Sequence, residues 1–296
     1  MRVAITGSSG LIGTELRRVL SERGDDVIRV VRSNPGPNDA LWDIEAGQID
    51  ADKLNGLDAI VHLAGAGIGD AKWTPKYKEV LLESRTLSTT LLAETLAALP
   101  EKPSVFLSGS AMGFYGNRGS AELTEDSERG SGFLADLVVD WEQAAQPAID
   151  AGIRTALLRT GVVLTTKGGA LKEQLPFFKM GVGGKIGDGS QYVSWISMAD
   201  HVRAMLHIID DDRLSGPINL TAPNPSTNAE FTKALGSALG RPTFLPTPKF
   251  AVEARLGKAA AEELVYFSAR ILPSALLESG FEFEHRTIDE AFGALL

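Results

Sequence analysis

The first sixteen residues, MRVAITGSSGLIGTEL, constrain the fold of this chain most. An apolar run, Arg2 to Thr6, leads into Gly7, Gly10 and Gly13, and apolar residues then recur at helical spacing as far as position 20. A second apolar run, DVIRVV, follows at 26–31. The segment therefore predicts a strand, a tight turn, a helix and a second strand, which together form one βαβ unit.

Three glycines at this spacing between a strand and a helix suit a dinucleotide. The chain must turn sharply, let a pyrophosphate approach the backbone, and let the helix pack closely on the strand. The helix N-terminus then offers free N–H groups and a partial positive charge to the anion. The alternative is a tight turn that holds no ligand, but the βαβ context favours a dinucleotide site.

The end of the second strand distinguishes the two nicotinamide dinucleotides. Folds that bind NAD usually place Asp or Glu here, to bind the adenosine ribose. This strand ends Val31-Arg32-Ser33, without an acid. A guanidinium can pair with a 2′-phosphate, which a carboxylate would repel. We therefore expect NADP(H) rather than NAD(H), with a solvated strand-end residue as the alternative interpretation of Arg32.

The remainder of the chain alternates strands and helices, which predicts a parallel sheet covered on both faces. The expected strands are 58–63, 104–107, 154–158 and 217–221, and the expected helices are 81–99 and 133–145. Residues 165–194 are rich in glycine and are expected to form loops over a cleft. The expected fold is α/β: a Rossmann-type doubly wound parallel sheet (1–165, with about 195–225) and a smaller, mostly helical substrate and C-terminal lobe (166–194 and 226–296).

Charge and composition limit the classes of partner that this chain is expected to bind. The net charge is −9 and Lys and Arg form no dense runs, so we expect neither nucleic acid nor an anionic membrane surface as a partner. Cysteine is absent and the four histidines lack ligand spacing, so no metal site is expected. No apolar run reaches ~18 residues, and the first strand leaves no room for a signal peptide. We expect a soluble cytoplasmic protein that acts on a small molecule.

Several motifs resemble one protein family. TGSSGLIG, HLAG (62–65), SGSAMGFYG (108–116), LRTGVVL (158–164) and WISMAD (195–200) follow the order found in extended short-chain dehydrogenase/reductases, the NAD(P)-dependent sugar epimerases and dehydratases. The segments KW (72–73), ESR (83–85), GFLADLVVDWE (132–142), TAPNPSTNAEF (221–231) and ILPSALLESGFEF (271–283) resemble an atypical branch, the "epimerase family" proteins with an added C-terminal helical domain.

This resemblance implies a set of cofactor contacts and a monomer or homodimer. The pyrophosphate side would comprise Gly7, Ser8, Ser9, Gly10, Leu11, Ile12 and Gly13, with Arg32 at the 2′-phosphate. Leu63, Ala64 and Gly65 would lie near the adenosine, and Ser84 would reach the cofactor from the long helix. The loop after the fifth strand, with Arg159, Gly161 and Val162, would run beside the nicotinamide.

Active members of the superfamily use a Tyr and a Lys four residues later, because the Lys lowers the Tyr pKa for proton transfer. The corresponding helix here offers Phe133 and Leu137 in one register, or Leu134 and Val138 in the next. None of these side chains transfers a proton. The chain therefore departs from the standard mechanism.

Three residues are candidates for the missing chemistry. Ser110 follows the fourth strand, Tyr115 lies just beyond it, and Glu125 occupies a family position that is acidic. They would orient a substrate hydroxyl or carbonyl beside the cofactor. The alternative is that Ser110 bonds local backbone, Tyr115 is a packed aromatic and the acidic loop is a solvated surface. Two functions stay open: an NADP-dependent oxidoreductase, epimerase or dehydratase, and a non-catalytic NADP(H) sensor or regulator.

Overall fold

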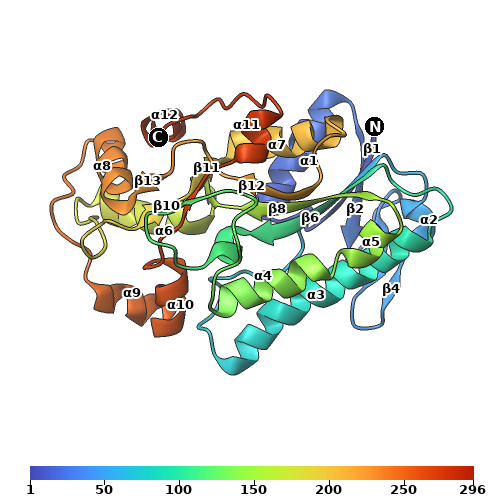
Figure 1. The fold of residues 1–296 in the computed structure, drawn as a ribbon, viewed down its shortest axis with the longest axis horizontal. Helices are drawn as coiled ribbons and strands as arrows, with labels where there is room; N and C mark the ends of the chain where they lie inside the picture. The colour runs from blue at the N-terminus through green and yellow to red at the C-terminus, as the bar shows by residue number, and fades with distance from the viewer.

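The computed structural model describes residues 1–296 and is organised around an eight-stranded sheet (Figure 1). The strand order is β12-β8-β6-β5-β1-β2-β3-β4. The bounds are β1 Arg2–Thr6, β2 Asp26–Val31, β3 Ala40–Asp43, β4 Gln48–Ile49, β5 Ala59–His62, β6 Val105–Ala111, β8 Arg154–Thr160 and β12 Gly216–Leu220. All neighbouring strands pair in parallel except β3 and β4. The predicted doubly wound sheet is confirmed.

The sheet order reverses between β1 and β5, and this reversal positions the site. From β1 the chain builds outward through β2 and β3, then returns to the other side of β1 with β5. Ligands of open α/β sheets bind at such a reversal, beyond the carboxyl ends of the strands. The β3–β4 hairpin was not predicted, because two short strands bearing Asp43 and Gln48 give little periodic signal.

Helices cover both faces of the sheet (Figure 1). One face packs on α1 (Leu11–Arg23) and α7 (Met198–Asp210), and the other packs on α3 (Pro75–Ala98) and α5 (Gln146–Asp150). The remaining elements here are α2 (Ala51–Leu54), the 3₁₀ turn η1 (Met112–Tyr115) and α4 (Phe133–Gln143). None of these helices is long and apolar enough to cross a membrane.

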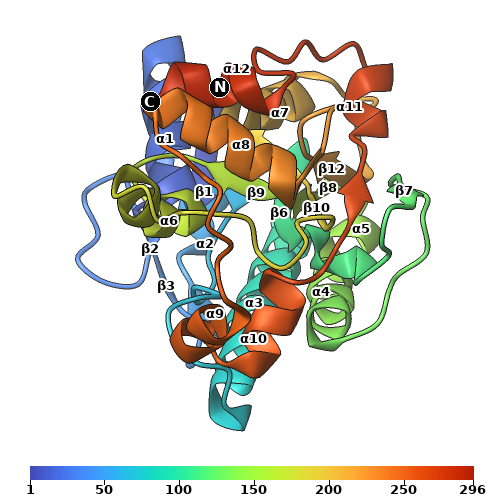
Figure 2. The same cartoon turned by 90° about the vertical axis from the view of Figure 1, so that its left-hand side faces the viewer.

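A helical lobe lies beyond the carboxyl ends of the strands (Figure 2). Its helices are α6 (Gly169–Lys179), α8 (Asn228–Leu239), α9 (Lys249–Leu256), α10 (Lys258–Leu264) and α12 (Ile288–Leu295). The short helix α11 (Ser274–Glu278) packs back on the face of the sheet, beside α7 and β12. Its short strand pairs are β9 (Val162–Leu164) with β11 (Trp195–Ser197), β10 (Tyr192–Val193) with β13 (Ser226–Thr227), and β7 (Glu122–Leu123) with β14 (Arg270–Ile271). A separate core joins α6, α8, β11 and α12 through Leu175, Phe231, Trp195 and Phe292.

Two expectations about residues beyond 159 are wrong in detail. Residues 169–179 form a helix rather than a loop, because Leu171, Leu175 and Phe178 share one buried face, which the flanking glycines concealed. The fifth strand runs to Thr160 rather than ending at residue 158. The C-terminal segment also returns to the sheet, where Leu276 packs in the same core as α1 and α7. The division into domains stays a prediction.

Candidate functional site

The glycine positions of the turn after β1 leave little or no room for side chains. Gly7 has a φ of +63°, and a Cβ there would lie 2.8 Å from the carbonyl carbon of Leu63. A Cβ on Gly13 would lie 2.3 Å from the Gly7 carbonyl oxygen, and one on Gly10 would lie 3.1 Å from it. The three glycines therefore let the turn, the first helix and the loop after β5 approach one another closely.

The N-terminus of α1 is open to an anion. Gly10 is the N-cap, no side chain caps the helix, and its first turn contains no acidic residue. Uncapped N–H groups and the helix dipole favour negative charge at this end. The predicted pyrophosphate contacts, Gly7 to Gly13, all lie on this turn or in the first turn of α1.

Arg32 follows β2 as an exposed side chain, and the structure records no hydrogen bond or ion pair for it. Asp39, an acid a few residues later, does not pair with Arg32, because its carboxylate pairs with Arg29 and accepts the Gly36 amide at 2.6 Å. Its hydrogen bond from Arg29 keeps the pKa of Asp39 below its usual value. The end of β2 therefore presents a free guanidinium and no free carboxylate.

The loop after β5 is tied to β1. The Thr6 hydroxyl accepts the Leu63 and Ala64 amides at 3.1 and 3.2 Å and lies 2.7 Å from Nδ1 of His62. The other ring nitrogen of His62 lies 2.9 Å from the Thr89 hydroxyl. Burial lowers the pKa of His62 to about 3, so the ring stays neutral and serves the structure of the loop.

The long helix α3 holds the other side of this loop. Ser84 accepts the Ala66 amide at 3.1 Å, and its predicted contact with the cofactor stays a prediction. The next residue, Arg85, donates to the carbonyl of Ala66 at 3.0 Å and lies 5.0 Å above the Trp141 ring. The structure records no carboxylate partner for Arg85, and burial lowers its pKa. Gly65 is exposed and leaves Arg85 without a covering side chain.

Sequence reasoning missed Arg85 as a candidate. Its only signal was the motif ESR, which supported the family resemblance without distinguishing the arginine from the serine before it. A half-buried cation without a carboxylate, beside a glycine turn, adds positive charge at the carboxyl-end edge of the sheet, where the α1 N-terminus also lies.

Ser110 and Tyr115 belong to one buried polar network at the carboxyl ends of β6 and β8. Ser110 donates to Glu142 at 2.6 Å, and Glu142 accepts two hydrogen bonds from Arg159 at 2.8 and 3.0 Å. Arg159 also donates to the Tyr115 hydroxyl at 3.1 Å, and that hydroxyl donates to Asn219 at 2.6 Å. The network joins an α4 side chain to three neighbouring strands.

The burial of this network limits what it can touch. The side chain of Tyr115 is 0% exposed and that of Ser110 is 3% exposed. Burial raises the pKa of Tyr115, and the charge of Arg159 only partly opposes that effect. In this conformation both side chains bond to protein groups, so they position the strand ends. A direct part in the reaction stays a prediction.

Glu125 lies beside the same network. One of its carboxylate oxygens accepts the amides of Asn219 and Ala275 at 3.0 and 3.3 Å, and the other is buried without a partner. Burial raises the pKa of Glu125, although the backbone amides favour its charged form. The Glu125 carboxyl group is therefore not a solvated surface group, and its part in the reaction stays a prediction.

The segment after β8 differs from its prediction. Arg159 was expected in a loop beside the nicotinamide, but it lies within β8 with a side chain only 3% exposed. Its guanidinium is bound to Glu142, because a buried charge requires a partner. Gly161 follows β8, its amide donates to Leu220 at 3.1 Å, and Val162 begins β9.

The helix α4, where the Tyr and Lys of active enzymes would lie, has apolar side chains at those places. Leu137 and Val138 are buried in an apolar cluster, to which Phe133 and Leu134 add partly buried side chains. Its N-terminus is capped from the lobe: Glu263 of α10 accepts the amides of Phe133 and Leu134 at 3.1 and 2.8 Å.

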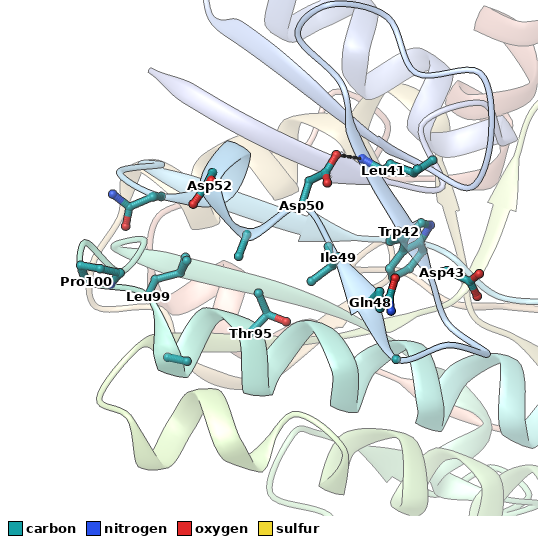
Figure 3. Close-up of a pocket in the computed structure, with 14 residues that line it drawn as sticks. Leu41, Trp42, Asp43, Gln48, Ile49, Asp50, Asp52, Thr95, Leu99 and Pro100 are labelled. Atoms are coloured by element: carbon teal, nitrogen blue, oxygen red, sulfur yellow. Dashed lines mark hydrogen bonds between the residues drawn. The ribbon is translucent and has the colours of Figure 1, made fainter.

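A pocket of about 810 Å³ lies away from all these residues (Figure 3). It is lined by the β3–β4 hairpin, the start of α2 and the C-terminal end of α3, including Trp42, Asp50 and Thr95. No residue of the glycine turn or of the Ser110 network lines it.

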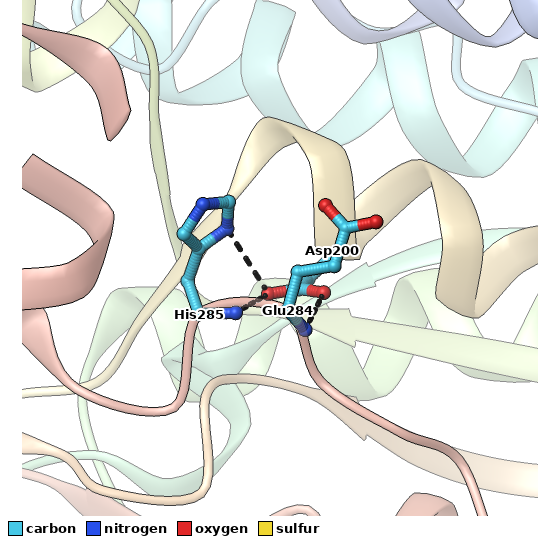
Figure 4. A group of neighbouring side chains, drawn as sticks. All are labelled: Asp200, Glu284 and His285. Atoms are coloured by element: carbon cyan, nitrogen blue, oxygen red, sulfur yellow. Dashed lines mark hydrogen bonds and ion pairs between the residues drawn. The ribbon is translucent and has the colours of Figure 1, made fainter. Parts of the chain in front are cut away.

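Asp200, Glu284 and His285 gather at the start of α7 (Figure 4). The buried Asp200 carboxylate accepts the amides of Glu284 and His285 at 2.8 and 2.9 Å and a hydrogen bond from Arg203 at 3.0 Å. Both oxygens are therefore committed, and the cluster fastens the C-terminal segment to the sheet.

The fold and the glycine turn define a Rossmann-type dinucleotide-binding protein. The profile described as the NAD dependent epimerase/dehydratase family matches residues 3–134, and a domain of unknown function (DUF1731) matches residues 247–295. An epimerase family protein of Mycobacterium leprae is 45% identical over 98% of this chain and 94% of that protein. The chain belongs to the epimerase family proteins, which confirms the resemblance to extended short-chain dehydrogenase/reductases.

Two solved structures resemble the chain. Human epimerase family protein SDR39U1 (isoform 2), crystallised with NADPH, is 34% identical, with a TM-score of 0.91 over 100% of this chain and 99% of that one. The nucleoside-diphosphate sugar epimerase from Corynebacterium glutamicum is 38% identical, with a TM-score of 0.80 over 100% of this chain and 59% of that one.

Proposed function

We propose that this protein binds NADP(H), with the pyrophosphate at the N-terminus of α1 and the 2′-phosphate at Arg32. The observation that carries the proposal is an uncapped helix N-terminus facing a turn in which a Cβ at Gly7 or Gly13 would collide with backbone. The unpaired Arg32 supports NADP(H) over NAD(H), and the NADPH found with human SDR39U1 supports the same choice.

Further residues would hold the dinucleotide along the sheet edge. Leu63, Ala64 and Gly65 would contact it from the loop that Thr6 fixes to β1. Ser84 would hold that loop from α3, and the charge of Arg85 would face the phosphate-bearing ligand. Gly161 and Val162 would border the nicotinamide side after β8.

The reaction proposed is that of an oxidoreductase or isomerase on a hydroxyl- or carbonyl-bearing small molecule, such as a sugar. The nicotinamide supplies the exchange of a hydride when it is bound. Ser110, Tyr115 and Glu125 would act as a linked set, since one network joins the first two and Glu125 bonds the strand that bears Asn219. The sugar epimerase from Corynebacterium glutamicum supports this substrate class.

A second candidate is a non-catalytic NADP(H) sensor or regulator. The observation that favours it is the apolar face of α4 together with the complete burial of Tyr115. Such a protein would bind the cofactor without turnover, and the bound state would alter a partner contact.

One experiment separates these functions. Calorimetry with NADPH tests binding, and turnover of sugars, nucleotide sugars and aldehydes is then followed by NADPH absorbance and by analysis of the products, because an epimerase returns the hydride and leaves the absorbance unchanged. Turnover of any of these compounds supports the enzyme, provided that it is slower in the Tyr115→Phe variant and that this variant keeps its NADPH affinity. Binding without turnover on every compound favours the sensor. Absence of binding by a folded protein contradicts both.

A further inference from the structure

The outer side of the helical lobe exposes a group of large apolar side chains, here called the outer apolar face. Phe244 is 79% exposed, Phe250 is 74% exposed and Met180 is 65% exposed. The face comprises Phe177, Met180, Val182, Phe244, Leu245 and Phe250. A contiguous group of exposed apolar side chains of this kind is typical of an interaction surface.

These residues form one surface because their two segments run side by side. The Thr247 amide donates to the Lys185 carbonyl at 2.9 Å, and the Thr247 hydroxyl donates to the Gly184 carbonyl at 2.9 Å. At the ends, Arg255 of α9 lies 3.2 Å from Glu173 of α6. Figure 2 shows the segment that joins α8 to α9 running along this side of the lobe.

The helix α9 is part of this surface and packs only partly against the lobe, with Leu256 beside the apolar cluster of α4. None of its eight residues is buried. A helix of this length gains most of its stability from packing, so a helix without a buried residue is only marginally stable alone. A binding partner that covered the apolar side chains of α9 would therefore stabilise this helix.

The charge around the outer apolar face is opposite to that of the whole chain. The chain has 29 Lys and Arg against 38 Asp and Glu, whereas residues 172–185 and 241–258 contain seven basic residues and two acidic ones. The basic residues are Lys172, Lys179, Lys185, Arg241, Lys249, Arg255 and Lys258, all exposed. Charges act over a Debye length of about 10 Å, so an approaching surface responds to this local charge rather than to the net charge of −9.

Against the expectation drawn from the net charge, we propose that the outer apolar face docks on an anionic lipid surface, with its phenylalanines inserted at the headgroup level and its Lys and Arg facing the lipid phosphates. Exposed aromatic side chains within a basic rim are typical of segments that lie in the membrane interface. Since no helix is able to span a bilayer, the contact is peripheral.

Two other occupants fit these observations less well. A second copy of the chain that docked through the same face would bring seven basic residues against seven, which opposes association. A folded acidic protein would have to match the shape of this face, and the pocket of Figure 3 is lined by no residue of it. A bilayer requires no such match.

The test is sedimentation of the full chain with phosphatidylcholine vesicles, with and without phosphatidylglycerol. The wild type is expected to bind the anionic vesicles and to be released at high salt. The double variant Phe244→Ser/Phe250→Ser is expected to lose binding. Lys249→Glu changes the local charge by two units, and at about fivefold in partition coefficient per charge it should weaken binding more than tenfold.

The matched control is Leu87→Ser, because Leu87 is also an exposed apolar residue, at 53%, but lies on α3. Its vesicle binding is expected to equal that of the wild type. Thermal unfolding midpoints and NADPH affinity are measured on every variant, and unchanged values establish that the fold is intact.

Three results would overturn the proposal. The wild type could fail to bind anionic vesicles, the control could lose as much binding as the phenylalanine variant, or neutral vesicles could bind equally well. If the wild type instead self-associates in light scattering and the phenylalanine variant does not, the face is an interface between copies. Because vesicle binding needs no cofactor, these outcomes are independent of the NADP(H) assignment.

Discussion

Replacing Glu142 with alanine removes the only carboxylate that pairs with Arg159. The two side chains are 11% and 3% exposed and share two hydrogen bonds of 2.8 and 3.0 Å. Removal of one partner of a buried ion pair costs about 3–5 kcal/mol, because a buried charge is left uncompensated. Arg159 keeps Tyr115 at 3.1 Å and lies over the Phe114 ring, so we expect the lower end of that range.

A loss of about 3 kcal/mol should lower the unfolding midpoint by roughly 6–12 °C in a protein of this size. Urea unfolding at neutral pH, followed by circular dichroism, gives the free energy of unfolding for each variant. The informative comparison is Glu142→Leu combined with Arg159→Met, which removes both charges and keeps the volume filled. We expect this double variant to be more stable than Glu142→Ala, because neither charge remains buried alone.

A surface pair serves as the control. Glu22 pairs with Arg18 on α1, where their side chains are 62% and 52% exposed, and Glu22→Ala should leave the urea midpoint within experimental error of the wild type. The reasoning is refuted if Glu142→Ala is as stable as this control, or if the double variant is no more stable than the single one.

Three further predictions follow from the described contacts. Gly13→Ala places a Cβ 2.3 Å from the Gly7 carbonyl oxygen and should weaken NADPH binding about tenfold or more by calorimetry, whereas Gly293→Ala, in open space on α12, should not. Glu263→Ala removes the cap on α4 and should cost about 1 kcal/mol, with faster hydrogen exchange of the first α4 amides. Burial lowers the pKa of His62 to about 3 and of His201 to about 4, from 6.5. Their neutral rings therefore contribute stability above pH 6.5 that is lost as the pH falls towards those values, which urea unfolding at stepped pH would detect; constant stability from neutral pH down to 4 would contradict it.

Local sequence predicted the N-terminal half of the site because its causes are local. The helix, the turn and the strands around Gly7 to Gly13 depend on spacing within thirty residues, and the structure places them as expected. The unpaired state of Arg32 followed from the absence of an acid at the end of β2. A resemblance in motif order then predicted the extended short-chain dehydrogenase/reductase fold.

The network around Arg159 could not be predicted in this way. Its partner Glu142 is 17 residues earlier, on α4, and the two meet only because that helix packs beside β8. No spacing rule connects them. The same applies to Glu263, which bonds the first amides of α4 although it lies more than a hundred residues later in the sequence. The sequence did not predict helix α6 for a different reason. Glycines on both sides of it and Pro176 within it are typical of a loop.

The most direct test of the account compares NADPH and NADH binding to the wild type and to Arg32→Asp by isothermal titration calorimetry. We expect the wild type to bind NADPH at least about tenfold more tightly than NADH, because the guanidinium pairs with the 2′-phosphate. Arg32→Asp should abolish that preference, because its carboxylate repels the phosphate and can bind the ribose hydroxyls. A folded wild type that binds neither nucleotide, or a variant that keeps the NADPH preference, would contradict the account.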